Sequence, residues 1–111
     1  MFWYRARRTS VLDTLAALRK RGIVELMPTT NVKDQAALDQ WLVDYEAWRV
    51  EALNTLKANY PESVYSEFEV VGSVTAYDWQ GAFNSAHNHK LSLLNLRLKA
   101  LERILERAQR T

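Results

Sequence analysis

The two histidines are the residues with the most versatile chemistry in this chain. His87 and His89 flank Asn88, and imidazole serves both as a metal ligand and as an acid or base near neutral pH. In a helix, residues two positions apart point about 200° away from each other, so this pair cannot grip one metal ion. His87 shares a helical side with Phe83 and Leu91, which predicts a partly buried structural side chain. A ligand or catalytic role and a pH-sensitive contact are the alternatives.

Other catalytic arrangements have little support in the sequence. The chain has no cysteine, so thiolate metal sites and cysteine nucleophiles are excluded. Its glycines, Gly22, Gly72 and Gly81, are too dispersed for a phosphate-binding loop. The carboxylates between residues 34 and 51 are spaced irregularly, which is typical of a solvated helix face. We therefore predict a protein that is not an enzyme and that has no cofactor and no metal.

The charge is sorted along the chain although the net charge is only +2. Residues 1–22 carry six Lys or Arg against one acidic group, residues 23–78 carry three against ten, and residues 79–111 carry six against two. Since both ends and much of the middle have helical patterns, this sorting predicts an acidic helix beside or between basic ones.

The apolar spacing predicts a single all-α domain over residues 1–111. Two long antiparallel helices are expected at about residues 32–59 and 79–109, with a shorter N-terminal helix over residues 10–21 and an irregular crossover, containing one short helix, at residues 61–78. Gly22 is expected to stop the first helix in a left-handed conformation. Residues 23–27 would then form an extended connection closed by Pro28.

Two apolar stripes are the predicted partner-binding residues. In the last helix, leucines recur at three- and four-residue steps, the spacing of a coiled-coil seam: Leu91, Leu94, Leu98, Leu101 and Leu105. In the acidic helix, Trp41, Tyr45 and Trp48 share one face. Such aromatics either fill a bundle interior or anchor an interface. Further apolar residues widen the leucine stripe beyond a two-helix contact, which favours a bundle.

The N-terminus combines aromatic and basic residues in the run from Phe2 to Arg8. Rings beside arginines are typical of segments that meet a membrane surface. The predicted anion or membrane contacts are Trp3, Arg5, Arg7, Arg8, Arg103 and Arg107. Docking of these aromatics onto the bundle is the alternative.

These features predict a non-catalytic helical protein–protein interaction or assembly module, of which a small regulator or inhibitor is one form. Its expected partner is another protein or a second copy in a homodimer. A basic nucleic-acid binder and a module at a membrane surface are the alternatives. No apolar run approaches the roughly 18 residues of a membrane span and no signal-peptide core follows the start, so a cytoplasmic location is expected.

Overall fold

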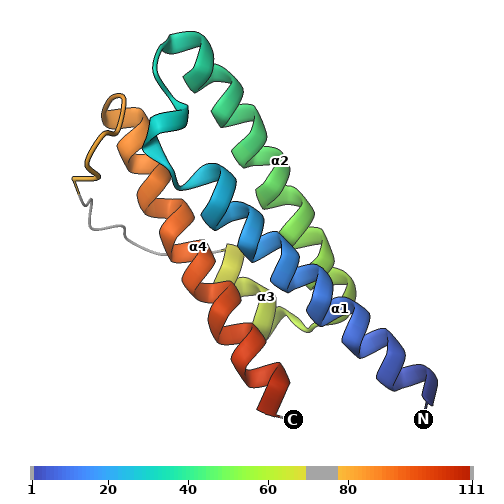
Figure 1. The fold of residues 1–111 in the computed structure, drawn as a ribbon. Helices are drawn as coiled ribbons and strands as arrows, with labels where there is room; N and C mark the ends of the chain where they lie inside the picture. The colour runs from blue at the N-terminus through green and yellow to red at the C-terminus, as the bar shows by residue number, and fades with distance from the viewer. Residues whose placement is uncertain (1, 70–77, 111) are drawn as a thin grey trace.

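The structure is a computed structural model that describes residues 2–69 and 78–110, with only the backbone of residues 2–9. Four α-helices, α1 (Phe2–Arg21), α2 (Gln35–Asn59), α3 (Glu62–Glu69) and α4 (Ser85–Arg110), are joined in part by a π-helical turn η1 (Gly22–Leu26) and a 3-10 turn η2 (Thr29–Asn31) (Figure 1). No strand occurs in the described ranges. The predicted all-α fold is confirmed.

The two longest helices, α2 and α4, run in the same direction, which corrects the expected antiparallel pair. Trp41 near the start of α2 contacts His87 near the start of α4, and Tyr45 bonds to Arg97 further along. The helix antiparallel to both is α1, which packs between them along its second half (Figure 1). The short α3 folds back along α2, and α4 begins at the same end of the bundle as α2 (Figure 1). The fifteen residues between α3 and α4 are enough chain to permit parallel helices.

The helix boundaries differ from the expected ones at three places. No Gly or Pro interrupts residues 2–21, and α1 accordingly starts at Phe2 and runs through Ser10. Asp34 caps α2 by accepting a hydrogen bond of 2.8 Å from the Ala37 N–H, so α2 starts three residues later than predicted. A turn with Gly81 at φ 86° keeps residues 79–84 out of α4. The crossover contains one short helix, α3, as predicted. The irregular structure predicted for residues 70–77 falls outside the described residues.

The first helix ends at Arg21 as predicted, but Gly22 is not the left-handed stop that was expected. Instead of a left-handed stop and an extended passage, the chain continues into η1, where the Met27 N–H donates to the Gly22 carbonyl at 3.0 Å. A Cβ on Gly22 would lie 2.7 Å from Leu98 Cδ2 and 3.0 Å from Trp48 Cζ2. Close helix packing favours glycine here, because a Cβ would press on Leu98 of α4 and Trp48 of α2.

The interior of the bundle is one hydrophobic cluster drawn from all four helices and from η1. Trp41, Tyr45 and Trp48 stack along α2, with ring centroids 5.4 Å and 6.3 Å apart. Phe68 of α3 packs against Trp48 at 5.8 Å. This aromatic column occupies the space between α1, α3 and α4 and fixes their positions against α2.

Candidate functional site

The eight residues predicted to bind a partner lie inside the single chain. Their exposed fractions are 9% or less, and the set is Trp41, Tyr45, Trp48, Leu91, Leu94, Leu98, Leu101 and Leu105. The leucine stripe of α4 packs against α1, α3 and the aromatic column. A partner cannot reach these side chains while the fold is intact, so a binding surface has to be sought on other faces.

The buried tryptophans also satisfy their polar atoms within the fold. Trp41 Nε1 donates to the Leu26 carbonyl at 2.9 Å, and Trp48 Nε1 donates to the Leu18 carbonyl at 2.7 Å. These carbonyls belong to the end of α1 and to η1, where helical carbonyls need outside donors. The two indoles therefore join α2 to the preceding elements as well as filling the core.

His87 is fully buried and holds the start of α4 together. Its ring Nδ1 accepts a hydrogen bond of 3.0 Å from the Phe83 N–H, while the backbone N–H of His87 donates to Asn84 Oδ1 at 2.9 Å. The ring sits edge-on to Trp41 at 4.8 Å. An accepting Nδ1 places the proton of the neutral ring on Nε2, which is buried without a hydrogen-bond partner among the described residues. Burial lowers the pKa of His87, since it disfavours the charged form.

His89 is exposed on another side of α4, so the two imidazoles do not converge. Within the described residues, no group of three His, Cys, Asp or Glu is placed to hold a metal ion.

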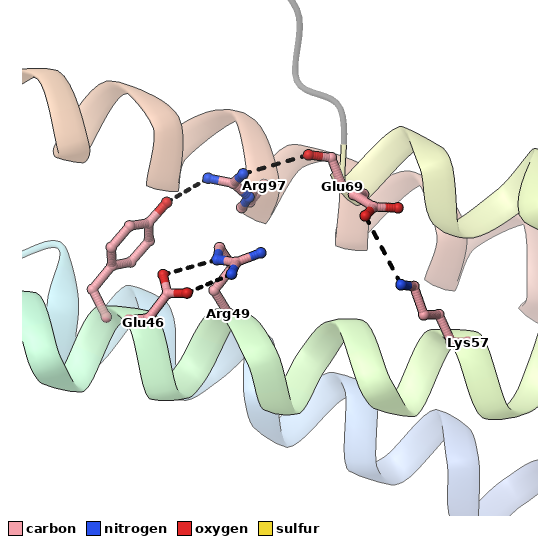
Figure 2. A network of polar contacts seen from close by, with 6 residues as sticks. Glu46, Arg49, Lys57, Glu69 and Arg97 are labelled. Atoms are coloured by element: carbon pink, nitrogen blue, oxygen red, sulfur yellow. Dashed lines mark hydrogen bonds and ion pairs between the residues drawn. The ribbon is translucent and has the colours of Figure 1, made fainter.

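Among the charged side chains that the structure describes, Arg97 is the least exposed, at 9%. Nη1 donates to the Tyr45 hydroxyl at 2.5 Å and Nη2 donates to the Glu69 carbonyl at 3.5 Å (Figure 2). The guanidinium also lies 5.9 Å from the centre of the Phe68 ring. The carbonyl is at the C-terminal end of α3, where the helix dipole favours a cation. Burial raises the pKa of the Tyr45 phenol, and the nearby Arg97 opposes that shift. The cluster binds α3 and α4 to α2, and its geometry indicates a structural role.

The predicted basic contacts have different environments. Arg107 donates to Glu67 Oε2 at 2.6 Å and so joins α4 to α3, whereas Arg103 is exposed. The side chains of Trp3, Arg5, Arg7 and Arg8 lie outside the described part of the structure. Further ion pairs join Arg19 to Glu102 and Arg21 to Glu51 across helices. Several basic and acidic groups are thus used against each other within the chain.

Among the large apolar side chains that the structure describes, the most exposed one lies on α2, on the side opposite its core residues. Val43 is 62% exposed and Val50 40% exposed, and with Leu42 and Ala47 they line a shallow apolar groove. We call the surface strip formed by Ala36, Gln40, Val43, Ala47, Val50 and Asn54 the outer face of α2. Its members follow one another at alternating four- and three-residue steps, as in a coiled-coil seam.

Acidic side chains border the outer face on both sides. Asp39 and Glu46 lie along one edge, and Asp44 and Glu51 along the other, all exposed. Glu46 is paired with Arg49 of the same helix, and this hydrogen bond lowers the pKa of Glu46 (Figure 2). Glu51 is paired with Arg21, whereas Asp39 and Asp44 accept only from the side-chain amides of Gln35 and Gln40 among the contacts described.

A polar cleft of about 510 Å³ opens beside this strip, between η1 and α2. Its walls include Glu25 and Asn31 from one side and Gln40, Asp44 and Ala47 from the other, with the edges of Trp41 and Trp48 among its lining. Since Gln40 and Ala47 also belong to the outer face, the cleft and the strip are continuous. Together they form the best candidate for a binding surface in the described structure.

The residue spacing of the outer face can be recognised in the sequence, but the Leu and Trp stripe of the same helix is a stronger pattern. The spacing of Ala36, Gln40, Val43, Ala47, Val50 and Asn54 is regular, yet small and polar members make it weak beside the Leu and Trp stripe of the same helix. Only the burial of that stronger stripe shows that the weaker one is left on the surface.

Comparisons of this chain with protein-family models, with curated proteins and with solved structures found no significant match. In the described residues, no helix combines the length and the apolar character needed to cross a membrane.

Proposed function

We propose that this protein is a non-catalytic helical module that binds another protein through the outer face of α2. The observation that carries the proposal is the exposed apolar strip around Val43, Ala47 and Val50 on a helix whose opposite side already fills the core. Exposed apolar strips rimmed by polar residues mark interaction sites more often than scattered apolar residues do.

The interior of the bundle supports a binding role over a catalytic one. His87 and Arg97 are the buried ionisable groups that would attract attention as catalysts. Both are engaged in holding helix ends, by the Phe83 N–H and by the Glu69 carbonyl respectively. The candidate cleft contains carboxylates but no adjacent nucleophile and base among its described lining residues.

Nucleic-acid or membrane binding has weaker support than protein binding. Arg19, Arg21 and Arg107 are paired with acidic groups of neighbouring helices, which reduces the positive field they could present. The surface with the clearest apolar character is bordered by carboxylates, which repel phosphate groups.

The proposal is tested by photo-crosslinking in the cells that make the protein. A benzophenone amino acid replaces Val43 or Val50 in turn, and Val24 serves as the matched control because it is a valine of η1 that is 58% exposed. We expect a discrete protein adduct from positions 43 and 50 that is absent at 24 and is lost when the other valine of the pair is changed to lysine. Adducts of equal yield at all three positions, or at none, would refute a binding role for the outer face.

A further inference from the structure

We propose that the partner segment is a basic amphipathic helix, which lies along the outer face of α2 and places Lys or Arg side chains against its acidic borders. This inference rests on the proposed function, because it names the chemistry of the occupant of the same surface.

The outer face has the dimensions and side chains of a helix-docking seam. From Ala36 to Asn54 it extends over five turns, or about 27 Å at 1.5 Å per residue. Ala36 and Ala47 are small and Val43 and Val50 are compact, so a second helix can approach to about 8–10 Å between axes. The occupant needed to cover the strip is therefore a helix of about 18 residues with one apolar side.

The acidic borders exclude a second copy of α2 as the favoured occupant. In a parallel pair, the coiled-coil register places Glu46 of one copy opposite Glu51 of the other and Asp39 opposite Asp44. In an antiparallel pair, each border faces its own equivalent, which is again acidic. Like charges in these positions repel and select against the pairing.

The same borders select a basic partner. Four carboxylates flank the seam, and two of them, Glu46 and Glu51, are paired with Arg49 and Arg21. The carboxylates of Asp39 and Asp44 have no cationic partner among the ion pairs described. Lysines or arginines beside the apolar side of a partner helix would meet these groups in the positions that coiled coils use for ion pairs.

The cleft beside the seam offers one deeper position for such a cation. Glu25 and Asp44 lie among its walls. A long cationic side chain fits this position, because its charged end can meet these carboxylates while its stem remains on the outer face. Arg21 also borders the cleft, but its guanidinium is directed to Glu51 at 3.2 Å.

The test uses three fluorescent 21-residue peptides and measures their binding by anisotropy. The basic peptide carries leucines at seam positions and lysines beside them, the acidic peptide replaces those lysines by glutamates, and the scrambled peptide keeps the basic composition without the seam. We expect the basic peptide to bind at least about tenfold more tightly than either control at low salt. Its affinity should fall several-fold by about 0.5 M salt, because exposed charges are then screened.

Two double variants and one control variant locate the peptide. Asp39→Lys together with Asp44→Lys should weaken binding of the basic peptide about tenfold, while Glu106→Lys, an exposed charge reversal on α4, should leave its affinity nearly unchanged. Val43→Ser together with Val50→Ser should also weaken binding, and circular dichroism should show that each variant is folded.

Equal affinity for basic and acidic peptides, equal affinity for the scrambled peptide, or no binding of any of them would overturn the inference. So would a dimer, measured by light scattering, that is lost on Val43→Ser and Val50→Ser. If crosslinking at positions 43 and 50 nevertheless captures a protein, the proposed function survives and only the basic character of the partner is refuted.

Discussion

Both sides of α2 carry apolar residues, but one side is buried in the core and the other is exposed. The inner side carries Trp41, Tyr45 and Trp48 at exposures of 4% or less, whereas Val43 and Val50 on the outer face are at least 40% exposed. The inner side is contacted by α1, η1 and α3, and it meets α4 through side chains. Apolar periodicity therefore predicts that a helix packs against other elements. The position of those elements determines which side of the helix is buried.

The comparison is most directly tested at Trp48. Trp48→Ala should lower the free energy of unfolding by about 3–5 kcal/mol, because it removes a buried indole from the centre of the core and leaves a cavity. Urea unfolding measures the loss. The control on the opposite side, Val43→Ala, should change stability by less than about 0.5 kcal/mol. Equal effects would mean that the two sides do not differ in packing.

The inner side also contains a polar contact that the outer face lacks. Tyr45→Phe should destabilise the protein by about 1–3 kcal/mol, because it removes the acceptor from the buried Arg97 guanidinium. The double variant with Arg97→Met should recover part of that loss, since an apolar side chain needs no acceptor. Thermal unfolding of both variants checks this, and additive losses would contradict it.

Gly22→Ala tests how tightly the inner side is packed. In an ordinary helical position this change stabilises by about 0.5–1 kcal/mol. Here we expect a loss of about 1–2 kcal/mol, because the new Cβ would overlap Leu98 and approach Trp48. A rise in the melting temperature would show that α1 and α4 have room to separate.

The last expected effect depends on pH and involves the contact between His87 and Trp41. Because burial lowers the pKa of His87 in the folded protein, the unfolded chain binds more protons below the usual histidine pKa of about 6.5. Stability should therefore fall as the pH drops from about 7.5 to 5.5, with a slope of up to about 1.4 kcal/mol per pH unit. Protonation would also remove the acceptor for the Phe83 N–H.

Urea unfolding at several pH values measures this slope. His87→Asn should flatten it, whereas His89→Gln at an exposed position should retain it. A slope that persists in His87→Asn would assign the proton uptake to other groups.

The sequence predicts the helices better than it predicts their ends. The three- and four-residue spacing of Trp41, Tyr45 and Trp48 indicates α2, and the leucine spacing indicates α4, because each helix has to hide one strongly apolar side. The left-handed conformation predicted for Gly22 is wrong, because a glycine after a basic turn resembles a helix stop. The structure instead explains this glycine by the close approach of Leu98 and Trp48, which are far away in the chain.

The relative direction of α2 and α4 could not be predicted from the sequence either, because it also depends on contacts between residues far apart in the chain. A connection of fifteen residues between α3 and α4 allows either direction, and the choice depends on which end of α2 receives His87 and Arg97. The candidate site was similarly hidden, because the spacing of Val43, Ala47 and Val50 becomes meaningful only once the aromatic stripe is known to be buried within one chain.

By itself, the sequence determines that this protein is helical, where its main apolar stripes lie, and that acidic and basic segments alternate. These are properties of short stretches, whose periodicity and charge are fixed by neighbours three or four residues apart. Only the tertiary structure decides that the leucine and aromatic stripes are buried in one core and that the outer face of α2 stays exposed. Burial depends on contacts between distant residues, and no local pattern contains them.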